Sequence, residues 1–386
     1  MHICIICEEY PPAPHGGTGA SYRDLAEGLA AAGHRATVIG VCTSGPVESR
    51  TDEMRNGVRV ITLPRASAKL GTRLGGWWER RALLGEVRRL HRLAPVDILE
   101  ASDYNGWLSH GSVCGIPSVV RIRGSNLFFD SELNRPPSIF EHRHERAAVQ
   151  KATHLGSVSR YAAERTMKLC GAEGRECTIL PNGVDATRFA PSASIAVEPG
   201  LIVFVNSLNP KKGIEQLIVA VNEILPSRAE GRLVVIGEDT QSKGSGRYLA
   251  SLKERVAPEI RERVVFTGRL AREQIIPWLQ RAGVACYPSH METFGIAPLE
   301  AMAVGRPTIF STLGPGPEVV EDGVSGLLCD PRDPKDIVRC ITTILDDGAL
   351  AQRLGDAARK RVLEVFDSRG WIGRNVAFYE RCIRKS

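Results

Sequence analysis

The chain of 386 residues carries a formal net charge of +6, with 43% hydrophobic and 24% charged residues. These values are typical of a folded globular protein and exclude disorder as its main state. The length favours two domains over a single core. The charge is too small to indicate nucleic-acid binding by itself. No apolar run approaches the roughly 18 residues that a membrane-spanning helix needs.

The chain opens with the apolar run MHICIIC, which leads directly into Glu8 and Glu9. This pattern predicts a buried first strand and not a signal peptide, so we expect a cytoplasmic protein. Ten cysteines without a repeated spacing are typical of reduced thiols. Because Cys4 and Cys7 lie inside the strand and not in a strand-to-helix turn, we expect neither a metal nor a redox role for this CxxC pair.

Short apolar runs then alternate with helical patterns along the chain, which is typical of βαβ units and a parallel sheet. The first series is HICIIC, a helix over 19–32, ATVIG, VRVITL, a helix near 79–93, DILEA and SVVRI. The alternation pauses near 189–199. A second series follows, with LIVFVN, a helix from Ile214, RLVVIG, a helix near 247–256, RVVFTG, VACYP and PTIFS. We therefore expect two α/β domains with the ligand in the cleft between them.

The segment from Arg65 to Arg92 has eight Lys or Arg and two Glu. In it Leu83, Leu84, Val87 and Leu90 recur at helical spacing, and the arginines Arg80, Arg81, Arg88, Arg89 and Arg92 fill other positions. With Trp77 and Trp78 in front, the basic amphipathic segment 77–93 is suited to peripheral contact with an anionic membrane surface. The alternative is that the tryptophans pack on the domain and the arginines are solvated.

A second charged stretch, EHRHER at 141–146, predicts a solvated helix face. In this interpretation Glu141 and Glu145 pair with neighbouring Arg and His side chains one helical turn away.

The segment METFGIAPLEAMAVGRP, residues 291–307, directly follows the strand VACYP. We predict that the strand ends at Pro288 and that a helix begins near Pro298, because proline is favoured at the first helical position. The loop between them presents Glu292 at the carboxyl edge of a sheet, where ligand-binding groups are usually found.

The amides around Phe294 to Ala297 would then lack intrahelical partners and attract a phosphate group. Glu300 would fall in the first turn of the same helix. Two interpretations of Glu300 stay open, a ligand contact and simple stabilisation of a carboxylate by the helix dipole.

These two glutamates, seven residues apart with FG after the first and EAMAxGxP around the second, resemble the signature of glycosyltransferase family 4. Further segments resemble that family in their expected order, and they span nearly the whole chain. They are PPAPHGGTGASYRDLAEGLAAAGHRATVIG (11–40), SVSRYAAERTMKLCG and ILPNGVDATRFAP (157–191), FVNSLNPKKGIEQLI, RVVFTGRL and GPGPEVVEDGVSGLL.

The resemblance implies the GT-B fold, with two Rossmann-like domains whose parallel sheets face each other across a cleft. The acceptor-binding domain would comprise residues 1–192 together with a C-terminal helix of about 369–386. The nucleotide-sugar-binding domain would comprise residues 193–368.

The same resemblance implies roles for individual residues. Glu292 would contact hydroxyls of the transferred sugar, Glu300 the ribose, and Lys212 the phosphate charge that develops on the leaving group. A solvated surface lysine is the alternative for Lys212. Gly16 and Gly17 would let the backbone approach the donor diphosphate without a Cβ in the way. The implied donor-binding residues are Gly16, Gly17, Ser207, Lys212, Arg269, Phe294, Gly295, Ile296 and Glu300, and the implied acceptor-binding residues are His15, Thr18 and Arg123.

Two positions depart from the family pattern. Asn206 and Ser207 stand where the family usually has Gly-Arg, so an arginine expected at the diphosphate is missing. Arg123 and Gly124 stand where it usually has His-Gly. Our hypothesis is that Arg123 supplies the lost positive charge and acts as a catalytic residue with Glu292 and Lys212. The alternative is an arginine that only pairs with a nearby acid.

The function that the resemblance implies is retaining transfer of a sugar from a nucleoside diphosphate sugar to a hydroxyl acceptor, which is a glycan, a lipid-linked molecule or a small molecule. No metal or other cofactor is required, and no nucleic acid is bound. The protein would be cytoplasmic, with peripheral contact to the inner face of the membrane. A pseudo-glycosyltransferase or a catalytically altered GT-B protein that binds nucleotide sugar stays open as the alternative.

Overall fold

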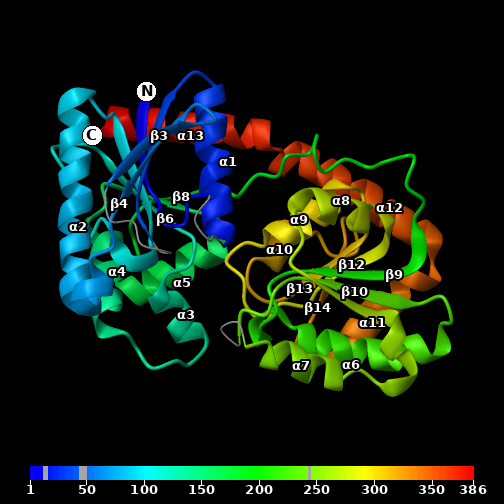
Figure 1. The fold of residues 1–386 in the computed structure, drawn as a ribbon. Coiled ribbons are helices and arrows are strands. Elements are labelled where there is room, and N and C mark those ends of the chain that lie inside the picture. Colours follow the sequence, from blue (N-terminus) through cyan, green and yellow to red (C-terminus); the bar gives the residue numbers. More distant parts are fainter. Residues whose placement is uncertain (12–15, 43–49, 242–244) are drawn as a thin grey trace. The chain divides into compact units, whose positions relative to one another are not determined.

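The computed structural model describes residues 1–11, 16–42, 50–241 and 245–386 (Figure 1). Contacts divide the chain into two compact units. Unit 1 comprises Met1–Asn182 and Arg369–Ser386, and unit 2 comprises Gly183–Ser368. Each is a sheet with helices on both faces, and each is described by itself.

The sheet of unit 1 has the strand order β3-β4-β2-β1-β5-β6-β7-β8. Every neighbouring pair is parallel except β3 with β4, which is antiparallel. Strand order reverses between β1 and β5, where ligands usually bind in open α/β sheets. The strands are β1 (His2–Ile6), β2 (Arg35–Val41), β3 (Thr51–Arg55), β4 (Val58–Leu63), β5 (Ile98–Ser102), β6 (Ser118–Ile122), β7 (His154–Ser157) and β8 (Cys177–Ile179).

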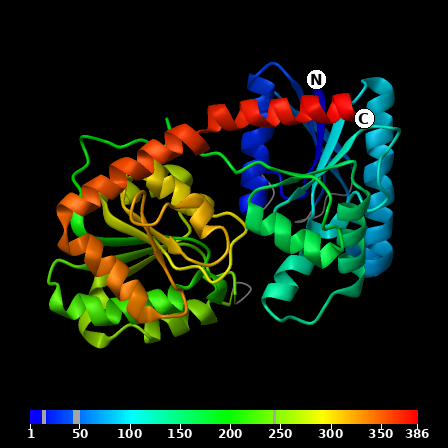
Figure 2. The ribbon, with the colours of Figure 1, turned by 180° about the vertical axis from the view of Figure 1, so that it is seen from behind.

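Two helices far apart in the sequence cover one face of this sheet. Helix α1 (Gly17–Ala31) and the C-terminal helix α13 (Ser368–Lys385) run across this face (Figure 2). With β1 they share one core, in which Tyr22, Leu25 and Trp371 are buried. Helix α2 (Ser67–Leu93) and α5 (Arg160–Cys170) contact other strands of the sheet. Helix α4 (Ile139–Lys151) packs against α3 (Asn126–Glu132), α5 and the 3₁₀ turn η1 (Tyr104–Gly106).

The sheet of unit 2 is entirely parallel, in the order β11-β10-β9-β12-β13-β14. Helices α6, α7 and α11 cover one face, α8 and α9 lie over the other, and α12 contacts both α9 and α11 (Figure 1). The strands are β9 (Glu198–Val205), β10 (Arg232–Ile236), β11 (Val264–Gly268), β12 (Ala282–Tyr287), β13 (Thr308–Ser311) and β14 (Leu327–Cys329). The helices are α6 (Ile214–Ile224), α7 (Arg247–Glu254), α8 (Arg272–Arg281), α9 (Ile296–Ala303), α10 (Gly316–Val319), α11 (Pro334–Asp346) and α12 (Gly348–Arg361).

The strands and helices expected from apolar periodicity are confirmed. The strand at the edge of the unit 1 sheet was not predicted. Strand β3, TDEMR, is exposed along most of its length and has no apolar face to signal it. Helix α2 begins at Ser67, well before the expected start near 79. The division based on contacts falls after Asn182, whereas the boundary expected from the sequence is 192. Val184 pairs with the end of unit 2, because its amide donates to the carbonyl oxygen of Phe366 and its own carbonyl oxygen accepts from the amide of Ser368.

The burial of side chains agrees with the sequence-based expectation at some positions and differs from it at others. Cys4 and Cys7 are free and buried, and burial raises the pKa of both thiols to about 12. Leu83 and Leu84 are buried as expected. Arg80 is buried too, because its guanidinium donates to the carbonyl oxygens of Gly76 and Asn105 instead of facing solvent.

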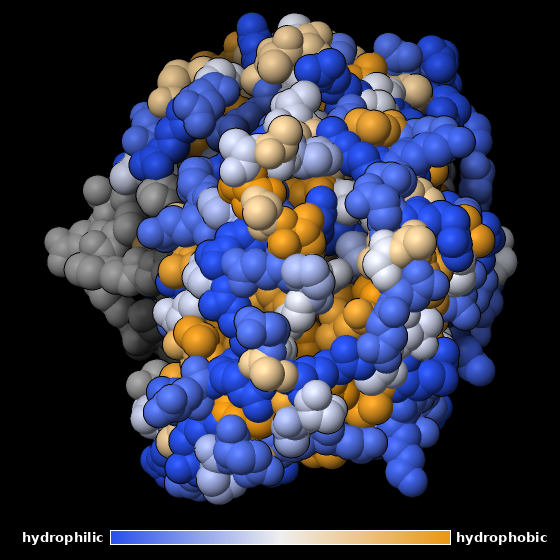
Figure 3. All heavy atoms as spheres, turned by 90° about the vertical axis from the view of Figure 1, so that its right-hand side faces the viewer, coloured by the Kyte–Doolittle hydropathy of each residue, from blue (hydrophilic) through white to orange (hydrophobic). Residues whose placement is uncertain are grey.

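Hydrophobic side chains also reach the surface. On the face drawn in Figure 3 they lie in small groups between hydrophilic side chains that cover most of the coloured area. None of the helices in the described part of the chain has the length and apolar character that crossing a membrane requires.

Candidate active site

One set of candidate site residues lies at the carboxyl edge of the unit 2 sheet. Strands β9 and β12 are parallel neighbours, with Val203 opposite Ala285. Their following loops, which carry Asn206 and Glu292, therefore emerge at the same edge. Because all strands of this sheet run in one direction, this is the edge at which an α/β domain usually binds its ligand.

A short turn brings Lys212 to this edge. The 3₁₀ turn η2 (Pro210–Lys212) ends at Gly213, whose φ is 70°. A Cβ at Gly213 would lie 1.7 Å from the carbonyl oxygen of Pro288, so only glycine fits. The amides of His290 and Met291 donate to the carbonyl oxygen of Lys211 at 2.9 and 3.2 Å, which ties the turn to the loop after β12.

The result is a close ion pair between two of the three predicted catalytic residues. Lys212 Nζ lies 2.5 Å from Glu292 Oε1, and the side chains are 12% and 13% exposed. Ser289 Oγ and Asn206 Nδ2 also donate to Oε1, at 3.4 and 3.5 Å. Among the described residues, no hydrogen bond reaches Glu292 Oε2, which leaves this oxygen as an acceptor for a hydroxyl donor.

The start of helix α9 lies beside this pair. The helix begins at Ile296, not near Pro298, and Glu300 is therefore beyond its first turn. Gly295 precedes it with a φ of 97°, and a Cβ there would lie 2.7 Å from the Phe310 ring. The first amides of a helix lack intrahelical partners and attract anions.

The side chain of Phe294 anchors the loop in front of this helix. It is 3% exposed and packs edge-on against Phe366, with ring centroids 5.9 Å apart. Within the described parts of the chain, the amides of Phe294 and Gly295 donate no hydrogen bond. The side chain therefore has a packing role, while the backbone retains the free donors that a phosphate needs.

Glu300 is held by a residue that the sequence did not single out. Arg272, at the start of α8, donates to Glu300 Oε1 from Nη2 at 2.8 Å and from Nε at 3.0 Å. Its guanidinium also lies 5.6 Å from the ring centroid of Phe189. Glu300 is 6% exposed, so neither its burial nor its arginine partner fits the interpretation of simple helix-end electrostatics. No motif signals Arg272, because the contact depends on how α8 packs beside α9.

The other two expected donor-binding side chains of unit 2 have different surroundings. The hydroxyl of Ser207 accepts a hydrogen bond from Asn209 Nδ2 at 3.0 Å. Arg269 is 61% exposed and lies 3.6 Å from the equally exposed Glu238. An exposed pair of this kind contributes little to stability, so Arg269 remains available to a ligand.

In unit 1, the expected glycines lie at the start of α1. Gly16 precedes the helix and donates its amide to Glu9 Oε2 at 3.3 Å, and Gly17 is the first helical residue. Among the residues that the structure describes, a Cβ at Gly17 would meet no neighbouring atom within 4 Å, so contacts with these residues do not require glycine there. Thr18 follows in the first turn. His15 lies outside the described residues.

Arg123 follows β6 and is 6% exposed. Its Nη1 donates to Ser21 Oγ and to Asn182 Oδ1, both at 2.9 Å, and its guanidinium lies 4.4 Å from the centroid of the Tyr22 ring. Across the described ranges, no carboxylate forms an ion pair with Arg123. The structure therefore does not show the alternative, in which this arginine only pairs with a nearby acid. Ser21 and Asn182 are further site neighbours that sequence patterns did not signal.

Asp103 accepts a hydrogen bond from the backbone amide of Arg123 at 2.9 Å. Burial raises the pKa of its carboxyl to about 7. Asp103 follows β5 as Arg123 follows β6, so both residues belong to the carboxyl edge of the unit 1 sheet. This edge therefore combines a buried cation with a carboxyl group that titrates near neutrality.

Two parallel α/β units joined in one chain, each with its polar groups at the carboxyl edge of the sheet, define the GT-B class of glycosyltransferases. The comparisons with known proteins agree. The family model described as Glycosyltransferase Family 4 matches residues 15–188, and that described as Glycosyl transferases group 1 matches residues 185–361. The chain belongs to this glycosyltransferase family.

Among similar proteins, glycogen synthase of Mycobacterium tuberculosis is 30% identical over 391 residues, which cover 95% of this chain and 91% of the relative. D-inositol 3-phosphate glycosyltransferase of Xylanimonas cellulosilytica is 30% identical over 56% of this chain and 54% of its own length. The solved sucrose-phosphate synthase of Thermosynechococcus elongatus superposes with a TM-score of 0.83, at 22% identity and with 100% and 99% of the two chains covered. Anabaena HepE in complex with UDP and glucose gives a TM-score of 0.76 at 18% identity, with 99% and 100% covered.

Among the described residues, no group of three or more His, Cys, Asp or Glu side chains is arranged to hold a metal ion. Each unit has its own set of candidate site residues. Lys212, Glu292, the start of α9 and the Arg272–Glu300 pair belong to unit 2, while Gly16, Gly17, Thr18 and Arg123 belong to unit 1.

Proposed function

We propose that this glycosyltransferase moves a sugar from a nucleoside diphosphate sugar to a hydroxyl acceptor with retention of configuration. The observation that carries the proposal is the Lys212–Glu292 pair beside the start of α9. A cation and free amides suit a diphosphate, and a carboxylate oxygen suits sugar hydroxyls. Retention is supported by the family resemblance alone.

In the proposed reaction the bond between the sugar C1 and the diphosphate oxygen breaks, and the acceptor oxygen bonds to C1. The nucleoside diphosphate leaves, and a phosphate oxygen takes the acceptor proton. Lys212 and the amides of Phe294 and Gly295 would stabilise the charge that develops on the diphosphate. Glu292 would orient the sugar, and Glu300, positioned by Arg272, the ribose.

Uridine nucleotides are the first donors to test, because HepE was solved with UDP and with UDP-glucose. The decisive experiment measures release of nucleoside diphosphate by the purified chain from a panel of nucleotide sugars, with and without sugar acceptors. Acceptor-dependent release that disappears in Lys212→Ala and persists in Lys253→Ala supports the proposal. A panel in which no donor is bound or consumed contradicts it. Lys253 is a suitable control because it is an exposed residue on α7.

A pseudo-glycosyltransferase, or a GT-B protein that binds nucleotide sugar without transfer, is the second candidate. It is favoured by Ser207, whose hydroxyl stands where an arginine is expected at the diphosphate. Slow hydrolysis of the donor without an acceptor separates the two, because a transferase often catalyses it and a binding protein does not.

We also propose peripheral contact with an anionic lipid surface through helix α2. Trp77 and Trp78 are 43% and 52% exposed, and the guanidinium of Arg81 lies 5.0 Å from the ring centroid of Trp77. Exposed indole rings beside arginines suit the interface of a membrane. Co-sedimentation with vesicles that contain phosphatidylglycerol tests this. Binding that the Trp77→Ala, Trp78→Ala variant retains in full would exclude this surface.

A further inference from the structure

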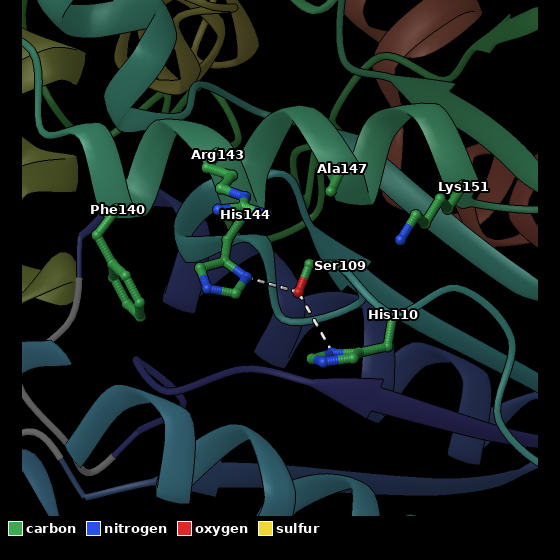
Figure 4. Close-up of a pocket in the computed structure, with 7 residues that line it drawn as sticks. All are labelled: Ser109, His110, Phe140, Arg143, His144, Ala147 and Lys151. Carbon is green, nitrogen blue, oxygen red and sulfur yellow. Dashed lines mark hydrogen bonds between the residues drawn. The ribbon is translucent and has the colours of Figure 1, made fainter. Parts of the chain in front are cut away.

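A pocket in unit 1 lies apart from the residues assigned to the active site. It has a volume of about 260 Å³ and lies between helix α4 and the loop after η1 (Figure 4). Pockets for drug-sized ligands begin near 300 Å³, so this one suits a small group or the end of a larger ligand. Nothing in the proposed reaction uses it.

One face of α4 forms the first wall. Phe140, His144, Ala147 and Lys151 are spaced by four, three and four residues, which places them on the same side of a helix. Figure 4 shows Phe140, His144 and Lys151 extending from α4 toward the loop that carries Ser109 and His110. The helical repeat therefore places an aromatic ring, an imidazole and an ammonium group along one wall.

Close packing fixes the distance between this wall and the loop. Gly106 has a φ of 58°, and a Cβ there would lie 2.2 Å from the backbone carbon of His144. On the other side of α4, the Glu145 carboxylate accepts hydrogen bonds from the amides of Asn105, Asn126 and Leu127. The expectation of a solvated EHRHER face is thus wrong for Glu145, which is fully buried because it binds these amides.

A buried hydroxyl joins the two histidines at the floor of the pocket. Ser109 is 4% exposed, and its Oγ lies 2.8 Å from His144 Nδ1 and 3.5 Å from His110 Nδ1. A hydroxyl has one proton to donate, so at least one of the two imidazoles must donate to it if both hydrogen bonds form. The Nε2 atoms are then the ring positions left for a ligand.

The charged residues that line the pocket are all basic. Arg143 and Lys151 line it, and in the described part of the chain neither forms an ion pair. No lining residue is acidic. Burial and the nearby Arg80, His110 and Arg143 lower the pKa of His144 to about 4. Burial, Lys151 and three arginines of α2, which are Arg80, Arg81 and Arg88, lower the pKa of His110. Bringing an anion into the pocket would offset this repulsion.

We propose that this pocket binds a phosphate group, held by Lys151, Arg143, the Ser109 hydroxyl and the two imidazoles. Charged hydrogen bonds from several cations are the usual means of holding phosphate. The group comes either from a soluble phosphate ester or from a lipid headgroup. The pocket is distinct from the predicted diphosphate site at the start of α9, which belongs to unit 2.

The test follows histidine side chains by NMR in the full chain while inorganic phosphate is added at constant ionic strength. We expect saturable shifts of the His110 and His144 signals, identified with His110→Gln and His144→Gln, and a rise in the pKa of His144. His2, which bonds to Pro95 and Thr37, serves as the internal reference. Lys151→Ala should weaken phosphate binding about tenfold, the usual size of a charged hydrogen bond.

Lys168→Ala is the matched control, because Lys168 is an exposed lysine of the same unit, on α5. A second arm replaces phosphate by vesicles of phosphatidylcholine with or without phosphatidylglycerol. Shifts with free phosphate alone support a soluble ester, and additional shifts with phosphatidylglycerol support a headgroup. Shifts that never saturate, or that Lys151→Ala leaves unchanged, would overturn the proposal. None of these signals depends on transferase activity, so they stand or fall separately from the proposed reaction.

Discussion

Lys212 Nζ and Glu292 Oε1 lie 2.5 Å apart although 80 positions separate the two residues in the chain. Two backbone hydrogen bonds from the loop after β12 to Lys211 hold the segments together. Before any ligand binds, the lysine is therefore already neutralised by the carboxylate. In the proposed reaction, a diphosphate would compete with Glu292 for the ammonium group, and Glu292 Oε2 would be available to the sugar.

Loss of Lys212 should affect turnover more than donor binding. Lys212→Ala is expected to lower kcat about a hundredfold to a thousandfold, because the ammonium group acts most strongly on charge that develops as the diphosphate leaves. Steady-state rates with the best donor of the panel, compared with Lys253→Ala, measure this. A variant that raises only KM would mean that Lys212 contributes uniform binding and no selective stabilisation of the transition state.

Arg272 should act through Glu300. Arg272→Ala removes the hydrogen bonds that Arg272 donates to Glu300 Oε1, so we expect weaker nucleotide binding, by about tenfold, with little change in kcat. Glu300→Gln should have an effect of similar size, and the double variant should lose less than the sum of both. Calorimetric titration with UDP and the other nucleoside diphosphates measures this, and fully additive losses would show that the two residues act independently.

Arg123 should be needed for turnover and not for folding. A buried cation without a carboxylate partner costs folding free energy, which is more typical of a functional site than of a stabilising contact. We expect Arg123→Met to lower kcat about a hundredfold while the melting temperature stays equal or rises. Arg123→Lys retains the charge and should recover part of the rate. Undiminished turnover in Arg123→Met would remove this residue from the catalytic set.

The stability of the protein should depend on pH through Asp103. Its folded pKa of about 7 lies above the unfolded value near 3.9, so the folded state holds the proton more tightly. The contribution is fully present below about pH 4 and is lost as the pH rises toward 7, with a slope of at most about 1.4 kcal/mol per pH unit. Glu8, whose pKa is also raised to about 7 mainly by burial, adds a loss of the same sign.

Asp103→Asn should therefore flatten the pH dependence without abolishing it. Urea unfolding of both proteins at intervals from pH 4 to pH 8 measures the two slopes. Curves that run parallel throughout this range would show that Asp103 has the same affinity for its proton in the folded and unfolded chain.

The C-terminal helix should depend on a buried ion pair. Arg121 Nη2 lies 2.8 Å from Glu100 Oε2, both side chains are almost fully buried, and Tyr379 and Asn375 of α13 bond to the pair. Arg121→Met leaves the Glu100 charge unpaired and should cost about 3–5 kcal/mol in the free energy of unfolding. Adding Glu100→Leu should recover much of the loss. Equal stability of the single and double variants in urea would contradict the coupling.

The fold class could be predicted from the sequence, because apolar periodicity reports which strands and helices are buried. Apolar runs such as LIVFV predicted two α/β domains, and segments such as the PNGVD link indicated the family. The strand-to-helix loop of residues 291–307 predicted the edge at which the donor binds. Helix ends were less certain. Since Ile296 and Ala297 are compatible with a helix start as well as with a loop, α9 begins two residues before the expected proline.

Which side chains contact one another could not be predicted from the sequence. Glu300 has Arg272 as its partner because α8 packs beside α9. Arg123 has Ser21 and Asn182 as its partners because helix α1 and the segment at Asn182 lie at the same edge of the sheet as Arg123. The phosphate pocket has no sequence signature either, because it needs the close approach at Gly106 to set α4 against its loop. Periodicity is a local property of the chain, whereas each of these contacts depends on residues brought together from distant segments.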